Sequence, residues 1–141
     1  FDEKGRLLRA MGTERMRGNS VHQFAFPYGV AIDRHGHNQI LIADNTNCRV
    51  SVWSRDGSEF VQAVGMEDAP KCLTIDHFGR LLVGLENNLI CVYELKTFKK
   101  IQSFGGRGSD PGNFSGIYGM CVTDDNTLVV CDRSNGRIQM F

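Results

Sequence analysis

Residues 26–33 read Phe26-Pro27-Tyr28-Gly29-Val30-Ala31-Ile32-Asp33, and varied copies of this stretch occupy residues 69–76 and 116–124. Each copy is followed by two more short apolar runs, which are residues 40–44 and 49–53 in the first case. The aspartates that end the three copies, at positions 33, 76 and 124, are 43 and 48 residues apart. A repeat of this length corresponds to one four-stranded blade of a β-propeller.

The apolar runs read as strands, because they are short, rich in β-branched residues and bounded by Gly, Asn and Asp. No long segment carries the apolar stripe of a helix. We therefore expect an all-β fold made of propeller blades of four antiparallel strands, three per chain, over residues 1–141. The expected boundaries are 26–65 for blade 1, 69–105 for blade 2 and 116–141 for blade 3. Blade 3 lacks its fourth, outer strand, and residues 1–12 supply an outer strand at the other end.

The repeated stretches resemble the NHL repeat, whose pattern is Pro-x-Gly-Val-Ala-x-Asp followed by Ile-x-Val-Ala-Asp-x-x-Asn-x-Arg-Val-x-Val-Phe. Residues 27–53 follow this pattern closely, and residues 116–141 keep its Asp, Asn and Arg. The second copy departs from it, because residues 85–90 replace the Asp and Arg. We expect blade 2 to lack the Asp–Arg contact of the family. The pattern positions are Asp44, Asn47 and Arg49 in blade 1, and Asp132, Asn135 and Arg137 in blade 3.

The resemblance implies a ring of about six blades, of which three are half. Two interpretations stay open. In the first, two chains close head to tail as a homodimer, with residues 6–11 of each pairing with residues 137–141 of the other. In the second, the chain is a piece of a longer propeller. The first is favoured by the unpaired strand edge that an open half-ring would expose.

One face of the propeller is expected to bind a partner. Strand direction alternates within a blade, so the crossings between blades and the loops between second and third strands share this crossing face. Tyrosine and lysine at equivalent first-strand positions suit stacking and hydrogen bonding around the channel mouth. The candidate residues are Tyr28, Lys71 and Tyr118 on the first strands, Asn45, Asn47, Asn87, Asn88, Arg133 and Asn135 in the loops, and Arg15 and Arg17 in the first crossing.

The resemblance implies a binding module: NHL domains of tripartite-motif proteins use this face for protein partners or single-stranded RNA, and accompany a ubiquitin-ligase module. Lys and Arg number 16, as do Asp and Glu, and the crossing-face loops mix both signs. Most of the affinity for nucleic acid comes from neutralising its phosphates with basic residues. The mixed charges of these loops therefore favour recognition of a protein or peptide substrate over the alternative, binding of single-stranded RNA. A third interpretation is a purely structural assembly domain. The loop charges are Arg15, Arg17, Arg107 and Arg133 against Glu14, Glu67, Asp68, Glu86 and Asp110.

No enzyme activity, metal or cofactor is expected in this chain. Some propellers that resemble this one are lyases or lactonases, and these enzymes need histidines or acidic residues that converge on the central axis of the propeller. Three of the four histidines (His35, His37 and His77, but not His22) fall in expected turns, and no acidic residue stands in the middle of the first strands. The aspartates that end these strands recur in every blade, which indicates a structural turn.

Cysteine usage and hydropathy point to an intracellular, cytoplasmic protein. The five cysteines are odd in number and form no Cys-x-x-Cys, so we expect buried reduced thiols rather than disulfides or a zinc site. No apolar run approaches the roughly 18 residues that cross a bilayer, and no membrane contact is expected.

Overall fold

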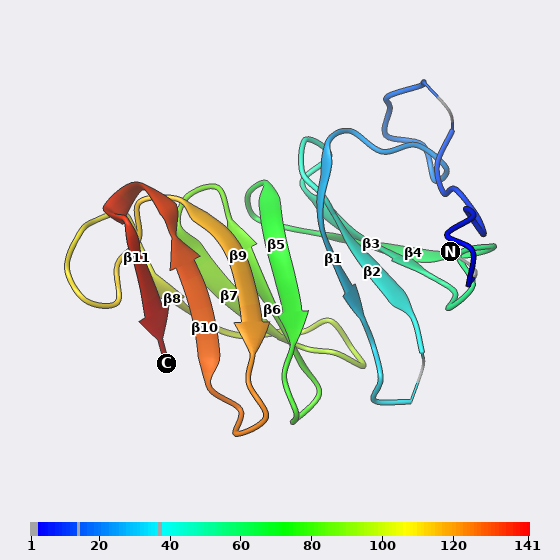
Figure 1. The fold of residues 1–141 in the computed structure, drawn as a ribbon. Coiled ribbons are helices and arrows are strands. Elements are labelled where there is room, and N and C mark those ends of the chain that lie inside the picture. The colour runs from blue at the N-terminus through cyan, green and yellow to red at the C-terminus, as the bar shows by residue number, and fades with distance from the viewer. Residues whose placement is uncertain (1–2, 14, 37) are drawn as a thin grey trace.

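The computed structural model describes residues 3–13, 15–36 and 38–141, which form three antiparallel sheets (Figure 1). The fold is all-β, as predicted. Two sheets have four strands and the third has three. In chain order the strands are β1 (Pro27–Ile32), β2 (Ile40–Asp44), β3 (Arg49–Trp53), β4 (Phe60–Gly65), β5 (Pro70–Ile75), β6 (Arg80–Leu85), β7 (Leu89–Glu94), β8 (Lys100–Gly105), β9 (Ile117–Val122), β10 (Leu128–Asp132) and β11 (Arg137–Met140), with a 3-10 turn at Arg133–Asn135.

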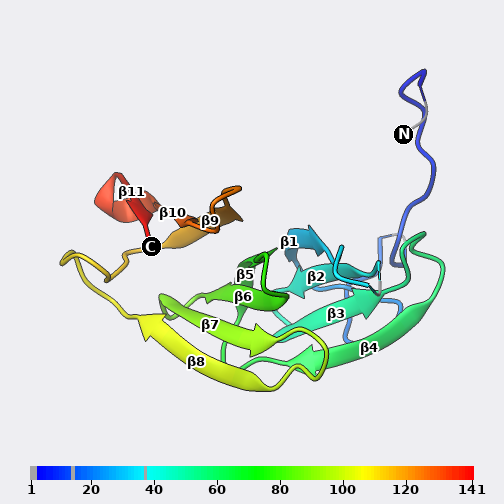
Figure 2. The same cartoon turned by 90° about the horizontal axis from the view of Figure 1, so that it is seen from below.

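Each sheet is a meander whose strands pair in sequence order, and the sheets stand side by side like blades. Strands β1, β5 and β9 are neighbours along the inner side of the arc, and β4 and β8 lie on its outer side (Figure 2). We keep the name blade 1 for β1–β4, blade 2 for β5–β8 and blade 3 for β9–β11. In Figure 1 the crossing face is at the top.

The core lies between neighbouring blades rather than within one. Leu41, Val50 and Val52 of blade 1 are fully buried against Leu81 and Val83 of blade 2. A second cluster fills the space between blades 2 and 3. Burying a side chain of this size stabilises the fold by about 1.5–3 kcal/mol, so each blade depends on its neighbours.

The face of blade 3 that points away from blade 2 is exposed to solvent, because no further blade packs on it among the described residues. Ile138 and Met140 of β11 are 58% and 66% exposed. Val50 and Val52, which hold the equivalent positions in blade 1, are 0% exposed. Blade 3 therefore presents to solvent the sheet face that blade 1 buries.

Residues 6–12 form no strand ladder with the described part of the chain. Leu7 and Leu8 are 79% and 73% exposed. An outer strand at residues 1–12 would need a blade beyond those of this chain, and residues 1–2 lie outside the described residues. That strand stays a prediction.

The turn between the first two strands of blade 3 corrects the sequence alignment. Asp33 and Asp76 directly follow β1 and β5, but the residue that directly follows β9 is Thr123, not Asp124. The Thr123 hydroxyl accepts the Thr127 N–H at 3.0 Å, so a threonine closes this turn. Asp124 is exposed, and its match to the other aspartates was wrong by one residue.

The prediction of buried cysteines holds for only two of the five. Cys72 and Cys91 are buried, and burial raises the pKa of these thiols to about 12 and about 11. Cys121 and Cys131 are exposed because they lie in blade 3, which this chain leaves uncovered, and Cys48 is exposed in a loop. No helix in the described residues is long and apolar enough to cross a membrane.

Candidate functional site: the Tyr118 groove

An aspartate at the end of β2 holds the segment that leads into β1, the first crossing, in place through hydrogen bonds. Asp44 is fully buried, and one of its oxygens accepts the Ala25 N–H at 2.7 Å. The other accepts hydrogen bonds from Asn47 Nδ2 at 2.8 Å and Arg49 Nε at 2.7 Å. Arg49 in turn donates to three backbone carbonyls of the crossing, those of Asn19, Ser20 and Gln23.

Blade 3 repeats this arrangement around its own crossing. Asp132 accepts the Ser115 N–H, Asn135 Nδ2 and Arg137 Nε, each at 2.8 Å. Burial by itself raises the pKa of the Asp132 carboxyl, but these hydrogen bonds outweigh it and hold the pKa below its ordinary value. Asn135 and Arg137 also donate to carbonyls of the crossing. Asn47 and Asn135 therefore have a structural task that is independent of any partner.

Blade 2 lacks the contact, as predicted. Leu85 and Leu89 occupy the positions of the Asp and Arg, and Leu85 is fully buried. The crossing into blade 2 covers only residues 66–69 and has no long loop to fasten. An apolar pair is therefore sufficient there.

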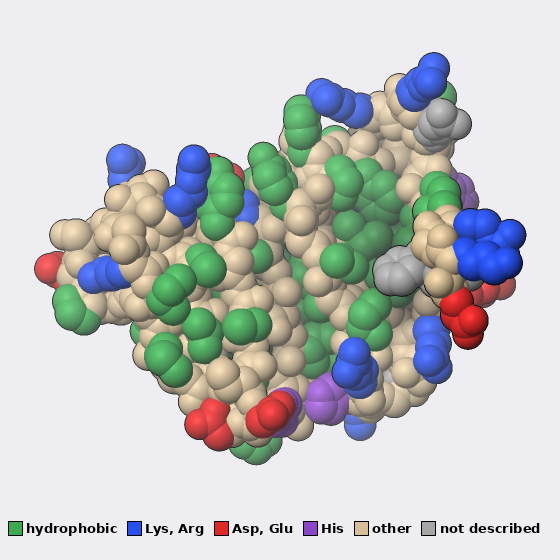
Figure 3. Space-filling view, viewed as in Figure 1, with side chains coloured by type: hydrophobic (Ala, Val, Ile, Leu, Met, Phe, Trp, Pro, Cys, Tyr) green, Lys and Arg blue, Asp and Glu red, His purple; other side chains and the backbone are tan. Residues whose placement is uncertain are grey.

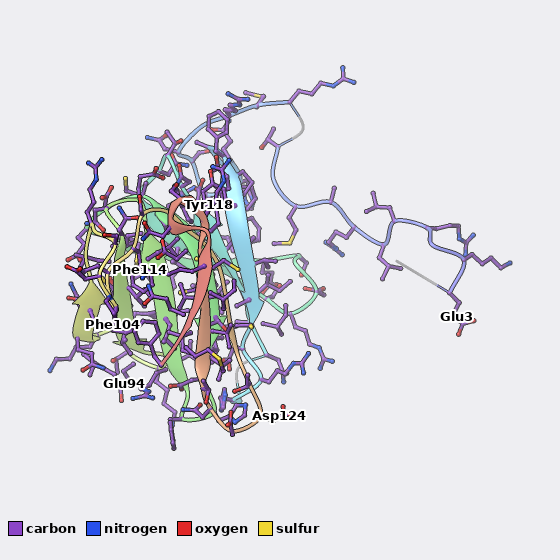
Figure 4. All side chains as sticks on the ribbon, turned by 60° about the vertical axis from the view of Figure 1, so that its left-hand side comes forward. Glu3, Glu94, Phe104, Phe114, Tyr118 and Asp124 are labelled. Carbon is purple, nitrogen blue, oxygen red and sulfur yellow. The ribbon has the colours of Figure 1, made fainter. Side chains whose placement is uncertain are left out.

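Tyr118 lies at the centre of a cluster of side chains on the crossing face. Its ring is contacted by two cations from different blades, with Lys71 Nζ at 4.9 Å and Arg133 Cζ at 4.6 Å from the ring centroid. Arg133 also donates to the Tyr118 hydroxyl at 3.1 Å. The ring remains 49% exposed, so a ligand can still reach it. Figure 4 shows Tyr118 at the upper end of the molecule, far from Asp124 at the lower end.

We call the cavity around this ring the Tyr118 groove. Its volume is about 600 Å³, and it lies between blades 2 and 3. Three of its lining residues are basic and one is acidic, and the acid, Glu86, pairs with Lys71 at 2.8 Å. Lys and Arg side chains stand along the upper edge of the molecule in Figure 3. The lining residues are Lys71, Glu86, Asn87, Asn88, Arg107, Ser115, Gly116, Tyr118, Arg133 and Ser134.

Five of the residues predicted from the sequence meet in this groove: Lys71, Asn87, Asn88, Tyr118 and Arg133. The two asparagines also shape it. Asn87 accepts the Leu89 N–H, and Asn88 accepts the Gly116 N–H at 2.7 Å, which ties the loop of blade 2 to blade 3.

The other predicted residues lie elsewhere. Tyr28 is 60% exposed but does not line the groove, and Asn45 donates to the Pro70 carbonyl. Arg17 stands 4.1 Å over the Phe26 ring, and Arg15 lies with it around a separate, smaller cavity in the first crossing. Their part in partner binding stays a prediction.

Arg107 is a groove residue that the site prediction missed. The two long crossings contain the same isolated bridge: a parallel bridge joins Arg17 to Phe24 in the first, and Arg107 to Phe114 in the second. Aligning the crossings as well as the strands would have identified Arg107 as the counterpart of Arg17. The signal was present in the residues Arg-Gly that begin both segments.

The histidines are dispersed. His22 packs edge-on against Trp53, with ring centroids 5.6 Å apart, and His35 and His77 lie in turns. His37 and Glu14 lie outside the described residues. Within the described ranges, no three His, Cys, Asp or Glu side chains are grouped to hold a metal ion.

Comparison with known proteins supports the propeller fold and its repeat. Residues 114–141 match the family model for the NHL repeat. A stretch of 39 residues, 28% of this chain, is 44% identical to E3 ubiquitin-protein ligase TRIM71 of Xenopus tropicalis, of which it covers 5%.

Two solved structures share the fold at low sequence identity. One is the WD40 beta propeller domain of Doa1, with a TM-score of 0.61 and 16% identity over 83% of this chain and 40% of that one. The other is a protein of unknown function from Bacteroides caccae, with a TM-score of 0.58 and 12% identity over 72% of this chain and 37% of that one. This chain thus spans less than half of the relative and of the two solved chains named here.

Proposed function

We propose, for a chain that is a segment of an NHL-repeat β-propeller, that the Tyr118 groove recognises a segment of a partner protein. The observation that carries this proposal is the half-exposed Tyr118 ring fixed between Lys71 and Arg133. A rigid aromatic ring beside cations is typical of an interface hot spot. With three basic residues and one acid, the groove suits an acidic side chain next to an apolar one.

The charges of the groove favour a protein partner over RNA. Glu86 already neutralises Lys71, whose side chain is only 13% exposed. Arg107 and Arg133 are then left to meet phosphates, whereas tight nucleic-acid binding uses many such contacts. Glu67, another acid of this face, pairs with Lys100 outside the groove.

The relative suggests a context for this recognition. That protein is an E3 ubiquitin-protein ligase. We propose that this chain is the non-enzymatic, substrate-recognising part of a larger cytoplasmic protein, and that any ligase activity belongs to segments outside residues 1–141.

Replacing Tyr118 with alanine is expected to weaken peptide binding about tenfold or more, because a hot-spot aromatic contributes more than about 1.4 kcal/mol. The measurement selects peptides from a displayed random library with the unmodified chain and then determines affinities by fluorescence anisotropy. Tyr28→Ala is the matched control, since it removes a tyrosine that is 60% exposed, against 49% for Tyr118, and lies outside the groove. Equal losses in both variants, or no enrichment of peptides, would contradict the proposal.

Single-stranded RNA is the alternative ligand, favoured by an aromatic ring in a groove lined by three cations, two of which contact the ring. A random single-stranded RNA pool, titrated with salt in the same anisotropy assay, distinguishes the two. Micromolar RNA binding whose salt dependence falls in a Lys71→Glu, Arg133→Glu double variant would favour RNA over the peptide.

Assembly of a six-blade ring from two chains is the second alternative, favoured by the exposed Ile138 and Met140. Analytical ultracentrifugation is then expected to give the mass of two chains, and Met140→Glu is expected to return it to one. A single-chain mass for the unmodified protein would exclude closure by dimerisation.

A further inference from the structure

A second groove lies at the opposite end of the blades from Tyr118. It has a volume of about 790 Å³ and is formed by turns of blade 2 together with His35 of blade 1. We call it the Phe78 groove, after its most exposed apolar residue. The turns that form it are residues 76–80 and 94–100. Glu94, one of the lining residues, is labelled in the lower part of Figure 4, whereas Tyr118 is at the top.

The lining of this groove offers apolar contact. Phe78 is 74% exposed, and the Arg80 guanidinium lies 5.1 Å from its ring centroid. Arg80 is itself held by Asp76 at 2.5 Å. Ile101, which is 54% exposed, and the buried Leu95 also line the groove.

The rim of the groove is strongly basic. Lys96 and Lys99 are exposed, and neither has an ion-pair partner among the described residues. Arg80 and Lys100 add two further cations, which pair with Asp76 and Glu67. The one acid of the lining is Glu94, which accepts a hydrogen bond from the Thr97 hydroxyl at 2.5 Å.

The groove is complete in this chain. Blades 1 and 2, which form it, are both present, and it uses turns at the ends of the strands rather than the uncovered sheet face of blade 3. The exposure of Phe78 is therefore not a consequence of a missing neighbouring blade. An aromatic ring held in place from one side and open on the other is available to a ligand.

We propose that the Phe78 groove binds an acidic segment of a partner protein, which seats an apolar side chain on Phe78 and Ile101 and places carboxylates at Lys96 and Lys99. An extended peptide fits this requirement, because its alternate side chains point to opposite sides. Charge complementarity favours an acidic peptide. The apolar lining, with a single aromatic ring, favours it over RNA, which would need several stacking rings.

The test uses a fluorescein-labelled peptide that alternates Glu and Leu, with anisotropy measured on the full chain. We expect the double variant Lys96→Glu, Lys99→Glu to bind at least about tenfold more weakly, because two attractive charge contacts become repulsive. Phe78→Ser is expected to weaken binding severalfold without changing the thermal unfolding temperature, since Phe78 is mostly exposed. A Glu and Ser peptide, which lacks apolar side chains, is expected to bind more weakly than the Glu and Leu peptide.

The matched control reverses two exposed charges outside both grooves, with Arg9→Glu and Arg55→Glu, and is expected to leave the peptide's affinity within about twofold. A Lys71→Glu, Arg133→Glu double variant shows which groove the peptide occupies, because the Tyr118 groove also suits an acidic segment. A loss of affinity in this double variant as large as that in the Lys96→Glu, Lys99→Glu variant would place the peptide in the Tyr118 groove and overturn the proposal. Failure of the unmodified chain to bind, or displacement of the peptide by single-stranded poly(U) RNA at lower concentration, would also overturn it.

Discussion

Replacing Asp44 with leucine is expected to lower the free energy of unfolding of this chain by about 3 kcal/mol. Asp44 is fully buried, and the Arg49 side chain is only 12% exposed. The substitution leaves the Arg49 charge without its counter-ion, deprives the Ala25 N–H of its acceptor and removes one of the two acceptors of Asn47 Nδ2. Urea unfolding followed by circular dichroism measures the change.

The structure itself provides the compensating change. Blade 2 holds Leu85 and Leu89 where blade 1 holds Asp44 and Arg49. Replacing a buried ion pair by apolar residues is often neutral, whereas removing one partner is not. The double variant Asp44→Leu, Arg49→Leu is therefore expected to regain more than half of the lost stability. A double variant as unstable as the single one would show that fastening the long crossing, rather than burying an unpaired charge, dominates the effect.

Much of the fold followed from the sequence because its determinants are local and repeated. The propeller fold predicted from the repeated stretches is confirmed, and residues 114–141 match the family model for the NHL repeat. The departure at Leu85 and Leu89 correctly predicted a blade without the Asp–Arg contact. The Asp–Arg contact of blade 1 could be predicted from the repeat pattern alone, because Asp44, Asn47 and Arg49 all lie in one hairpin.

What the sequence missed depends on contacts between blades. Equivalent positions in a repeat share a backbone environment but not their neighbours, so Tyr28 and Tyr118 looked alike. Tyr118 is contacted by Lys71 of the preceding blade, whereas the described residues form no blade before blade 1 that could contact Tyr28 in the same way. The exposure of Cys131 has the same cause, since the equivalent Ala43 is buried by blade 2. The error at Asp124 has a different cause. Thr123 is the counterpart of Asp33 and Asp76, but the aspartate next to it in the sequence was aligned with them instead.

Replacing Phe114 with alanine is expected to lower the free energy of unfolding by about 4 kcal/mol, the largest effect we predict. Phe114 is fully buried in the cluster between blades 2 and 3, and its ring lies 5.8 Å from that of Phe141. Gly105 leaves room for it, because a Cβ there would lie 2.8 Å from the ring. Alanine would open a cavity at this joint and remove contacts with both blades. Chemical unfolding measures the loss.

Phe24→Ala is the matched control, because Phe24 has the same place in the crossing of blade 1. It is half-buried and contacts Trp53 at a ring separation of 5.8 Å, but the described residues form no second blade that packs against it from the other side. Its loss is expected to cost about half as much as the loss of Phe114. Equal costs would mean that each phenylalanine stabilises its own crossing, and that the joint between neighbouring blades contributes little. A larger cost at Phe114 would instead identify the space between blades, rather than the individual blade, as the unit that stabilises this fold.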